Sequence, residues 1–96
     1  MQDVSGAPPM EFALRQNYPN PFNPTTVVSY DLSAVSEVKL VVYDILGREV
    51  VILVNEKQEP GRYNVRLDGS GLSSGVYVYR LTTGQYVESR RMVLLK

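Results

Sequence analysis

The 96-residue sequence predicts an all-β protein, an antiparallel sandwich of about seven strands. From Thr26 onward, apolar and polar residues alternate with a period of two, and β-branched and aromatic side chains dominate each run. Glycine, proline, asparagine or serine separates the runs at intervals of roughly 8–12 residues. No stretch shows helical periodicity, and the length suits a single hydrophobic core.

The N-terminal part precedes the regular strands. Residues 1–11 combine glycine, alanine and two prolines without apolar periodicity, which predicts a linker to something upstream, with residues 12–96 forming the folded domain. A short strand is expected near residues 12–14. Three prolines within six residues, from Pro19 to Pro24, then predict a rigid, extended loop. Two aromatic residues are the expected apolar anchors of this loop, Tyr18 and Phe22.

The first long strands form a meander. We expect strands over Thr26–Leu32, Glu37–Asp44 and Arg48–Val54, with a tight turn at 44–47 in which Gly47 adopts a positive φ. The second strand turns alternate apolar residues toward the core, namely Val38, Leu40 and Val42.

Three further strands follow a polar connection at 55–60. They are expected over Gly61–Asp68, Val76–Thr82 and 85–96. The predicted core residues of the first two are Tyr63, Val65, Leu67, Tyr77, Tyr79 and Leu81. This number and spacing of strands is typical of an immunoglobulin-like sandwich, and a single barrel of five or six strands is the alternative.

Composition excludes several classes of function. The chain has no cysteine, histidine or tryptophan, so it lacks the residues for a disulfide, a thiolate or imidazole metal site, or a histidine-based triad. Ten acidic and ten basic residues give zero net charge, which argues against nucleic-acid binding. The longest apolar run, Val50–Val54, is too short to cross a bilayer, and Met1–Val4 lacks the pattern of an export signal. We expect no catalytic residues, no cofactor and no transmembrane segment.

The carboxylates and tyrosines have ordinary structural explanations. Asp31, Asp44 and Asp68 lie at predicted strand ends, where aspartate bonds nearby backbone amides. They lack the spacing of a calcium loop, so no metal is predicted. A row of exposed tyrosines would suit a sugar ligand, but the predicted core position of Tyr77 and Tyr79 favours burial. The better candidates for exposed rings are Tyr43 and Tyr86.

The last strand mixes basic and apolar residues. Arg90, Arg91 and Lys96 flank the run Met92–Leu95, whereas Glu11 and Asp3 make the N-terminal stretch acidic. One interpretation is that solvated charges protect an edge strand from aggregation. The other is that an exposed terminal strand offers a partner both backbone pairing and side-chain pockets.

Four blocks occur in a characteristic order. They are Gln16–Thr26, Val42–Val50, Leu72–Leu81 and Arg91–Lys96. In this order they resemble the type A C-terminal sorting domain of the type IX (Por) secretion system, from about Phe12 to Lys96. The departure is Arg91, where lysine is frequent, a change that keeps the charge but alters its geometry.

The resemblance implies a non-catalytic, immunoglobulin-like domain appended to a large exported protein of Bacteroidota-type bacteria. Such a domain is read in the periplasm by the outer-membrane translocon and its shuttle proteins, and its cargo reaches the cell surface or the medium. A sortase-type peptidase commonly removes it, which here would place the cut near Ser5, Gly6 and Ala7. The residues expected to carry recognition are Gly75, Val76, Tyr77, Arg90, Arg91, Met92, Val93, Leu94, Leu95 and Lys96.

Two other functions stay open at this point. The middle of the chain, from Tyr43 to Tyr79, is also similar to the immunoglobulin-like module of the flagellar hook-capping protein, which would make the domain a structural assembly module. That family lacks the proline-rich loop. The third hypothesis is an accessory sugar-binding domain of a secreted glycoside hydrolase.

Overall fold

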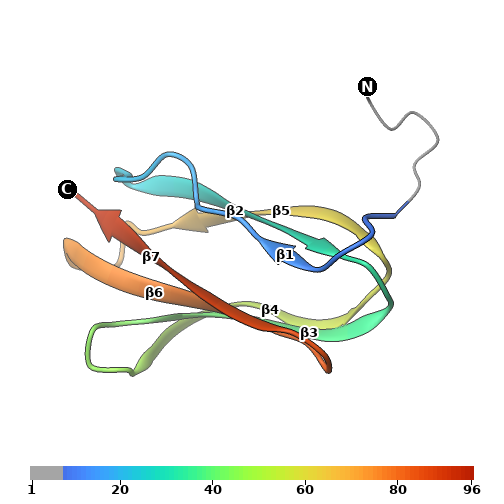
Figure 1. The fold of residues 1–96 in the computed structure, drawn as a ribbon. Coiled ribbons are helices and arrows are strands. Elements are labelled where there is room, and N and C mark those ends of the chain that lie inside the picture. The colour runs from blue at the N-terminus through green and yellow to red at the C-terminus, as the bar shows by residue number, and fades with distance from the viewer. Residues whose placement is uncertain (1–7) are drawn as a thin grey trace.

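A computed structural model describes residues 8–96 as two antiparallel sheets packed face to face (Figure 1). The three-stranded sheet has the order β1-β2-β5, with β1 at Ala13–Leu14, β2 at Thr25–Leu32 and β5 at Gly61–Asp68. The four-stranded sheet has the order β4-β3-β6-β7, with β3 at Ser36–Tyr43, β4 at Glu49–Gln58, β6 at Gly75–Thr82 and β7 at Val87–Leu94. The predicted seven-stranded, all-β sandwich is confirmed, and the single-barrel alternative is wrong because the described strands form two separate sheets.

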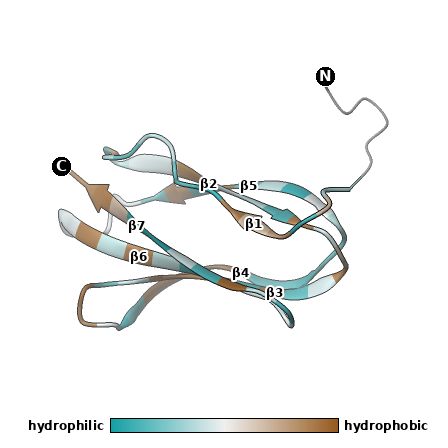
Figure 2. Ribbon diagram, in the orientation of Figure 1, coloured by the Kyte–Doolittle hydropathy of each residue, from teal (hydrophilic) through white to brown (hydrophobic). Residues whose placement is uncertain are grey.

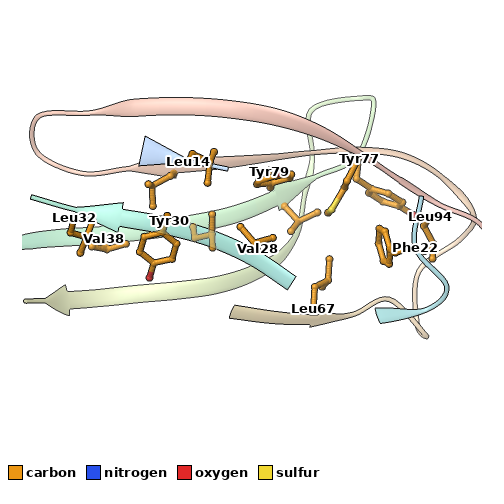
Figure 3. Packing of buried hydrophobic residues seen from close by; sticks show 14 residues of the cluster. Leu14, Phe22, Val28, Tyr30, Leu32, Val38, Leu67, Tyr77, Tyr79 and Leu94 are labelled. Atoms are coloured by element: carbon orange, nitrogen blue, oxygen red, sulfur yellow. The ribbon is translucent and has the colours of Figure 1, made fainter. Parts of the chain in front are cut away.

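The core lies between the inner faces of the two sheets (Figure 3). It consists of Leu14, Phe22, Val28, Tyr30, Leu32, Val38, Leu40, Val42, Leu67, Tyr77, Tyr79, Leu81, Met92 and Leu94. The predicted core faces of β3 and β6 are thus confirmed. Val41 is also buried although it alternates onto the outer face of β3, where it lies between Arg80 of β6 and Ile52 of β4.

Strand β4 is longer than expected. The polar connection predicted over Asn55–Pro60 is wrong, because residues 55–58 continue β4 and pair with the first half of β3, from Ser36↔Gln58 to Lys39↔Asn55. Polar composition favoured a loop, but cross-strand pairing at a half-exposed sheet edge determines the conformation. The β3–β4 pairing also has two register shifts, between Leu40 and Val41 and between Val42 and Tyr43.

The three aspartates singled out in the sequence differ in role. Asp44 and Asp68 accept bonds from turn amides as predicted, and their hydrogen bonds, to the backbone of Arg48 and to the side chain of Ser70 respectively, lower the pKa of each. The expectation for Asp31 is wrong. Its side chain is 7% exposed and accepts a bidentate pair from Arg15, with N···O distances of 2.6 and 2.7 Å. Burial beside β1 favours a charge-assisted pair there over a backbone cap.

Burial of Tyr30 makes the protein less stable as the pH becomes alkaline. Loss of solvent raises the pKa of Tyr30 from 10.0 to about 12, while its hydroxyl donates to Gln58 at 2.6 Å and its ring stacks on Tyr63. Between these two pH values the unfolded chain loses the phenolic proton and the folded chain keeps it, so the free energy of unfolding falls as pH rises.

We therefore expect Tyr30→Phe to lose less stability than the parent chain between about pH 9 and about pH 11, measured by urea unfolding. A residual loss remains, because burial also raises the pKa of Tyr79 and Tyr86. If the free energy of unfolding fell equally with pH in the two proteins, the loss would not come from Tyr30.

Candidate functional site

The proline-rich segment 16–24, called the strap from here on, lies along the outer edge of β7 (Figure 1). The backbone of Phe22 donates to the Val93 carbonyl at 2.9 Å and accepts from the Leu95 amide at 3.0 Å. The Asn20 side-chain oxygen accepts from the Val93 amide at 2.9 Å, and the Gln16 side chain donates to the Arg91 carbonyl at 2.7 Å. Sequence blocks more than 70 residues apart thus form one surface.

Buried contacts fix the strap to the sandwich. The Asn17 side chain donates to the Pro19 carbonyl and to the Thr26 hydroxyl, and the Asn17 amide donates to the Tyr79 hydroxyl at 2.8 Å. Of the two predicted anchors, Phe22 is 1% exposed and packs in the core beside Leu94 (Figure 3). The expectation for Tyr18 is wrong. Tyr18 is 80% exposed, and backbone bonds to Val27, rather than its ring, hold it to the sandwich.

The strap changes what β7 offers to a partner. β7 is an edge strand of its sheet, as one interpretation of the sequence requires. However, the outward amide and carbonyl of Val93, the carbonyl of Arg91 and the amide of Leu95 are already bonded to the strap. Along Arg91–Leu95 the pairing edge is therefore occupied within the domain, and only the side chains of the outer face are free.

The predicted recognition residues separate into two groups. Tyr77, Met92 and Leu94 are buried in the core and support the site from behind. The outward members are Val76, Arg91, Val93, Leu95 and Lys96, whose side chains are exposed or half-buried.

The two remaining predicted residues have specific structural roles. The Arg90 side chain donates to the Leu14 carbonyl at 2.6 Å and so ties β7 to β1. Gly75 has a φ of +153°, a conformation that other residues rarely adopt, which explains a glycine at the start of β6.

A hollow of about 730 Å³ lies where the strap meets the outer face of β6 and β7. Val76, Val78 and Val93 supply its apolar part, which we call the valine floor, and Gln16 and Asn20 line it from the strap. In Figure 2, β6 carries alternating brown and pale bands, as its sequence of valines alternating with tyrosines requires. The tyrosines of β6 face the core, so the more aliphatic face is the one turned outward.

A smaller hollow of about 250 Å³ adjoins the first, since Val78 lines both. Tyr43 and Ile45 line its far side, and Ile45 is largely exposed at the β3–β4 turn. The expectation that Tyr43 and Tyr86 present exposed rings is wrong. Arg80 lies over the Tyr43 ring at 5.2 Å, and Tyr86 stacks on Phe12.

The larger hollow is electropositive. The ion pairs within the described chain involve Arg15, Arg48, Arg62 and Lys39, all away from its lining. Within residues 8–96, Arg80, Arg90 and Arg91 therefore have no carboxylate within 4.0 Å. Arg90 and Arg91 were expected from the sequence. Arg80 and Val78 were not, although their alternation with the core residues of β6 was the available signal.

Residues 8–96 hold no cluster of three acidic, histidine or cysteine side chains suited to a metal ion. Nor does any helix in this region have the length and apolarity needed to cross a bilayer. The predicted processing residues Ser5, Gly6 and Ala7 lie outside the described residues.

A family model described as "secretion system C-terminal sorting domain" matches residues 16–95. The chain belongs to this family. The match begins at the first residue of the strap and ends directly after β7, so it spans both parts of the sorting domain that form the hollow. The resemblance to a type IX sorting domain is confirmed. The family that matches is this one and not that of the flagellar hook-capping protein. Searches of curated proteins and of solved structures gave no match to the sorting domain.

Proposed function

We propose that this sorting domain is the address that takes an upstream cargo protein from the periplasm, through the outer-membrane type IX machinery, to the cell surface or the medium. The observation that carries the proposal is the assembly of the strap and β7 into one surface. The family match covers both of them, and they are distant in sequence.

The outward residues of this surface are the ones that we assign to partner contact. Val76, Arg91 and Val93 present side chains to solvent, whereas Met92 and Leu94 lie in the core beneath them. Recognition by the translocon and its shuttle proteins therefore reads the shape and charge of a folded face. The domain itself supplies no catalytic group in this proposal.

The position of the cargo is compatible with such contact. The described chain enters at one end of the sandwich, near Phe12, and the strap meets Leu94 at the other end (Figure 1). We propose that residues 1–11 are the linker, that 12–96 form the folded unit, and that a sortase-type peptidase cuts near Ser5, Gly6 and Ala7. A cut there would leave the recognition face unchanged.

A reporter fusion tests the address without disturbing the core. The sequence is joined behind an export signal and a fluorescent reporter in a type IX-competent bacterium, and surface and medium fluorescence are measured. The test variant is Val76→Glu with Arg91→Glu. We expect its delivery to fall at least about tenfold, because a reversed charge and a buried carboxylate each cost more than about 1.4 kcal/mol at a contact.

The opposite sheet provides a matched control. Val27 and Arg66 form a cross-strand pair on the outer face of β2 and β5, and Val27 is 37% exposed against 39% for Val76. Val27→Glu with Arg66→Glu thus makes the same change in charge and composition, and we expect parental delivery from it. Parental delivery from the test variant would contradict the assigned face, and no delivery from the parent fusion would contradict the address.

A further inference from the structure

The hollow beside β7 combines apolar surface with positive charge that no acidic side chain of residues 8–96 neutralises. We propose that it binds an extended protein segment that turns aliphatic and acidic side chains to the same face, toward the hollow. This inference rests on the proposed function, since it names the chemistry that the secretion machinery would present to the domain.

The aliphatic requirement follows from the valine floor. Val76 and Val78 lie two residues apart on the same face of β6, and Val93 faces Val76 across the β6–β7 pair. Side chains two apart on an extended segment have the same spacing of roughly 6.6–6.8 Å, so they can contact successive floor residues. Covering these valines removes apolar surface from water, which is the non-directional part of the affinity.

The acidic requirement follows from the arginines. Arg91 lines the hollow from the outer face of β7, and Arg80 borders it through its bond to the Ser89 hydroxyl at 3.1 Å. Arg90 also lines it, but the Arg90 side chain is bonded to the Leu14 carbonyl. A carboxylate on the same face of the segment, placed beside Arg91 and Arg80, gains charge-assisted hydrogen bonds that no carboxylate of the described chain provides. Binding should therefore weaken as salt concentration rises.

Other classes of ligand fit the hollow less well. Sugars are recognised by stacking on aromatic rings, and the floor consists of valines. Polybasic membrane contact uses clusters of roughly four to eight lysines and arginines, more than the hollow holds. Addition of a strand to the β7 edge is blocked along Arg91–Leu95 because the strap occupies it.

The test is an NMR titration of the isotope-labelled chain with a capped peptide of sequence (Val-Ser-Glu-Ser)₃, which in extended form has its valines and glutamates on one face. We expect amide shifts confined to the strap, β6 and β7, and affinity at least about tenfold weaker for Arg91→Gln, the loss of one charged hydrogen bond. The matched control is Arg66→Gln, an exposed arginine on the outer face of β5, for which the affinity should not change. The peptides (Val-Ser-Lys-Ser)₃ and (Ser-Ser-Glu-Ser)₃ should bind at least about tenfold more weakly.

Several results would overturn the inference. They are absence of shifts with (Val-Ser-Glu-Ser)₃, equal binding of (Val-Ser-Lys-Ser)₃, shifts centred on β4 or β5, and retention on phosphatidylglycerol vesicles without peptide binding. The titration uses no secretion machinery, so its failure is distinguishable from failure of the address. If the chain delivers its reporter but does not bind the acidic peptide, the proposed function stands and this inference is wrong.

Discussion

Phe22→Ala is expected to lower the free energy of unfolding by about 3–5 kcal/mol. The Phe22 ring is 1% exposed and packs beside Leu94, so its removal leaves a cavity between the strap and β7. The site has little room to collapse, since a Cβ placed on Gly69 would already lie 3.1 Å from both the Phe22 and the Leu94 side chains. For a domain of this length the melting temperature should fall by at least about 12 °C, measured by calorimetry.

Tyr18→Ala is the matched control for this variant. It removes an aromatic ring from the same strap, but that ring is 80% exposed. We expect a change within about 0.5 kcal/mol, as for other surface substitutions. Equal destabilisation by the two variants would show that the strap, rather than the Phe22 cavity, determines the loss.

Tyr79→Phe is expected to cost about 2–4 kcal/mol. The Tyr79 hydroxyl donates to the Arg15 carbonyl at 2.7 Å and accepts from the buried Asn17 amide at 2.8 Å. Phenylalanine fills the same space but leaves both backbone groups without this partner. Hydrogen exchange should then show faster exchange of the Asn17 and Val93 amides, because the strap is loosened at its root.

Tyr77→Phe gives the comparison on the same face of β6. Its hydroxyl makes one bond, to the Ser73 carbonyl at 2.6 Å, so we expect a cost of about 1 kcal/mol. Exchange at Asn17 should stay at the parental rate in that variant. If both variants loosened the strap equally, the hydroxyl of Tyr79 would not be its specific anchor.

The period of two was sufficient to predict most strands and their core faces. It succeeded where one face is buried and the other wet, as along β5 and β6, because a shift of one residue would expose the whole apolar set. It failed at residues 55–58, where both faces of the β4 edge tolerate polar side chains and alternation carries no signal.

The site could be predicted only in part. The sequence pointed to the closing strand and to the proline-rich block, but not to their contact, because the Asn20 and Gln16 bonds to β7 depend on tertiary packing. For the same reason Tyr18 and Phe22 looked equivalent in sequence and differ in the fold. Burial of Asp31 escaped prediction as well, since its partner Arg15 is 16 residues away.

The distance in sequence between the strap and β7 has a consequence for the order of events in a cell. The bond between Asn20 and Val93 joins residues 73 apart in sequence. The surface that we assign to recognition therefore cannot form until Val93 has been synthesised. Contacts of such long range form late in folding, because the chain between them must first be closed into a loop. In the proposed arrangement, with cargo upstream, an interrupted or half-folded product would lack this surface. If the domain acts as the proposed address, a surface that depends on Val93 would also report that the chain has been made and folded as far as β7.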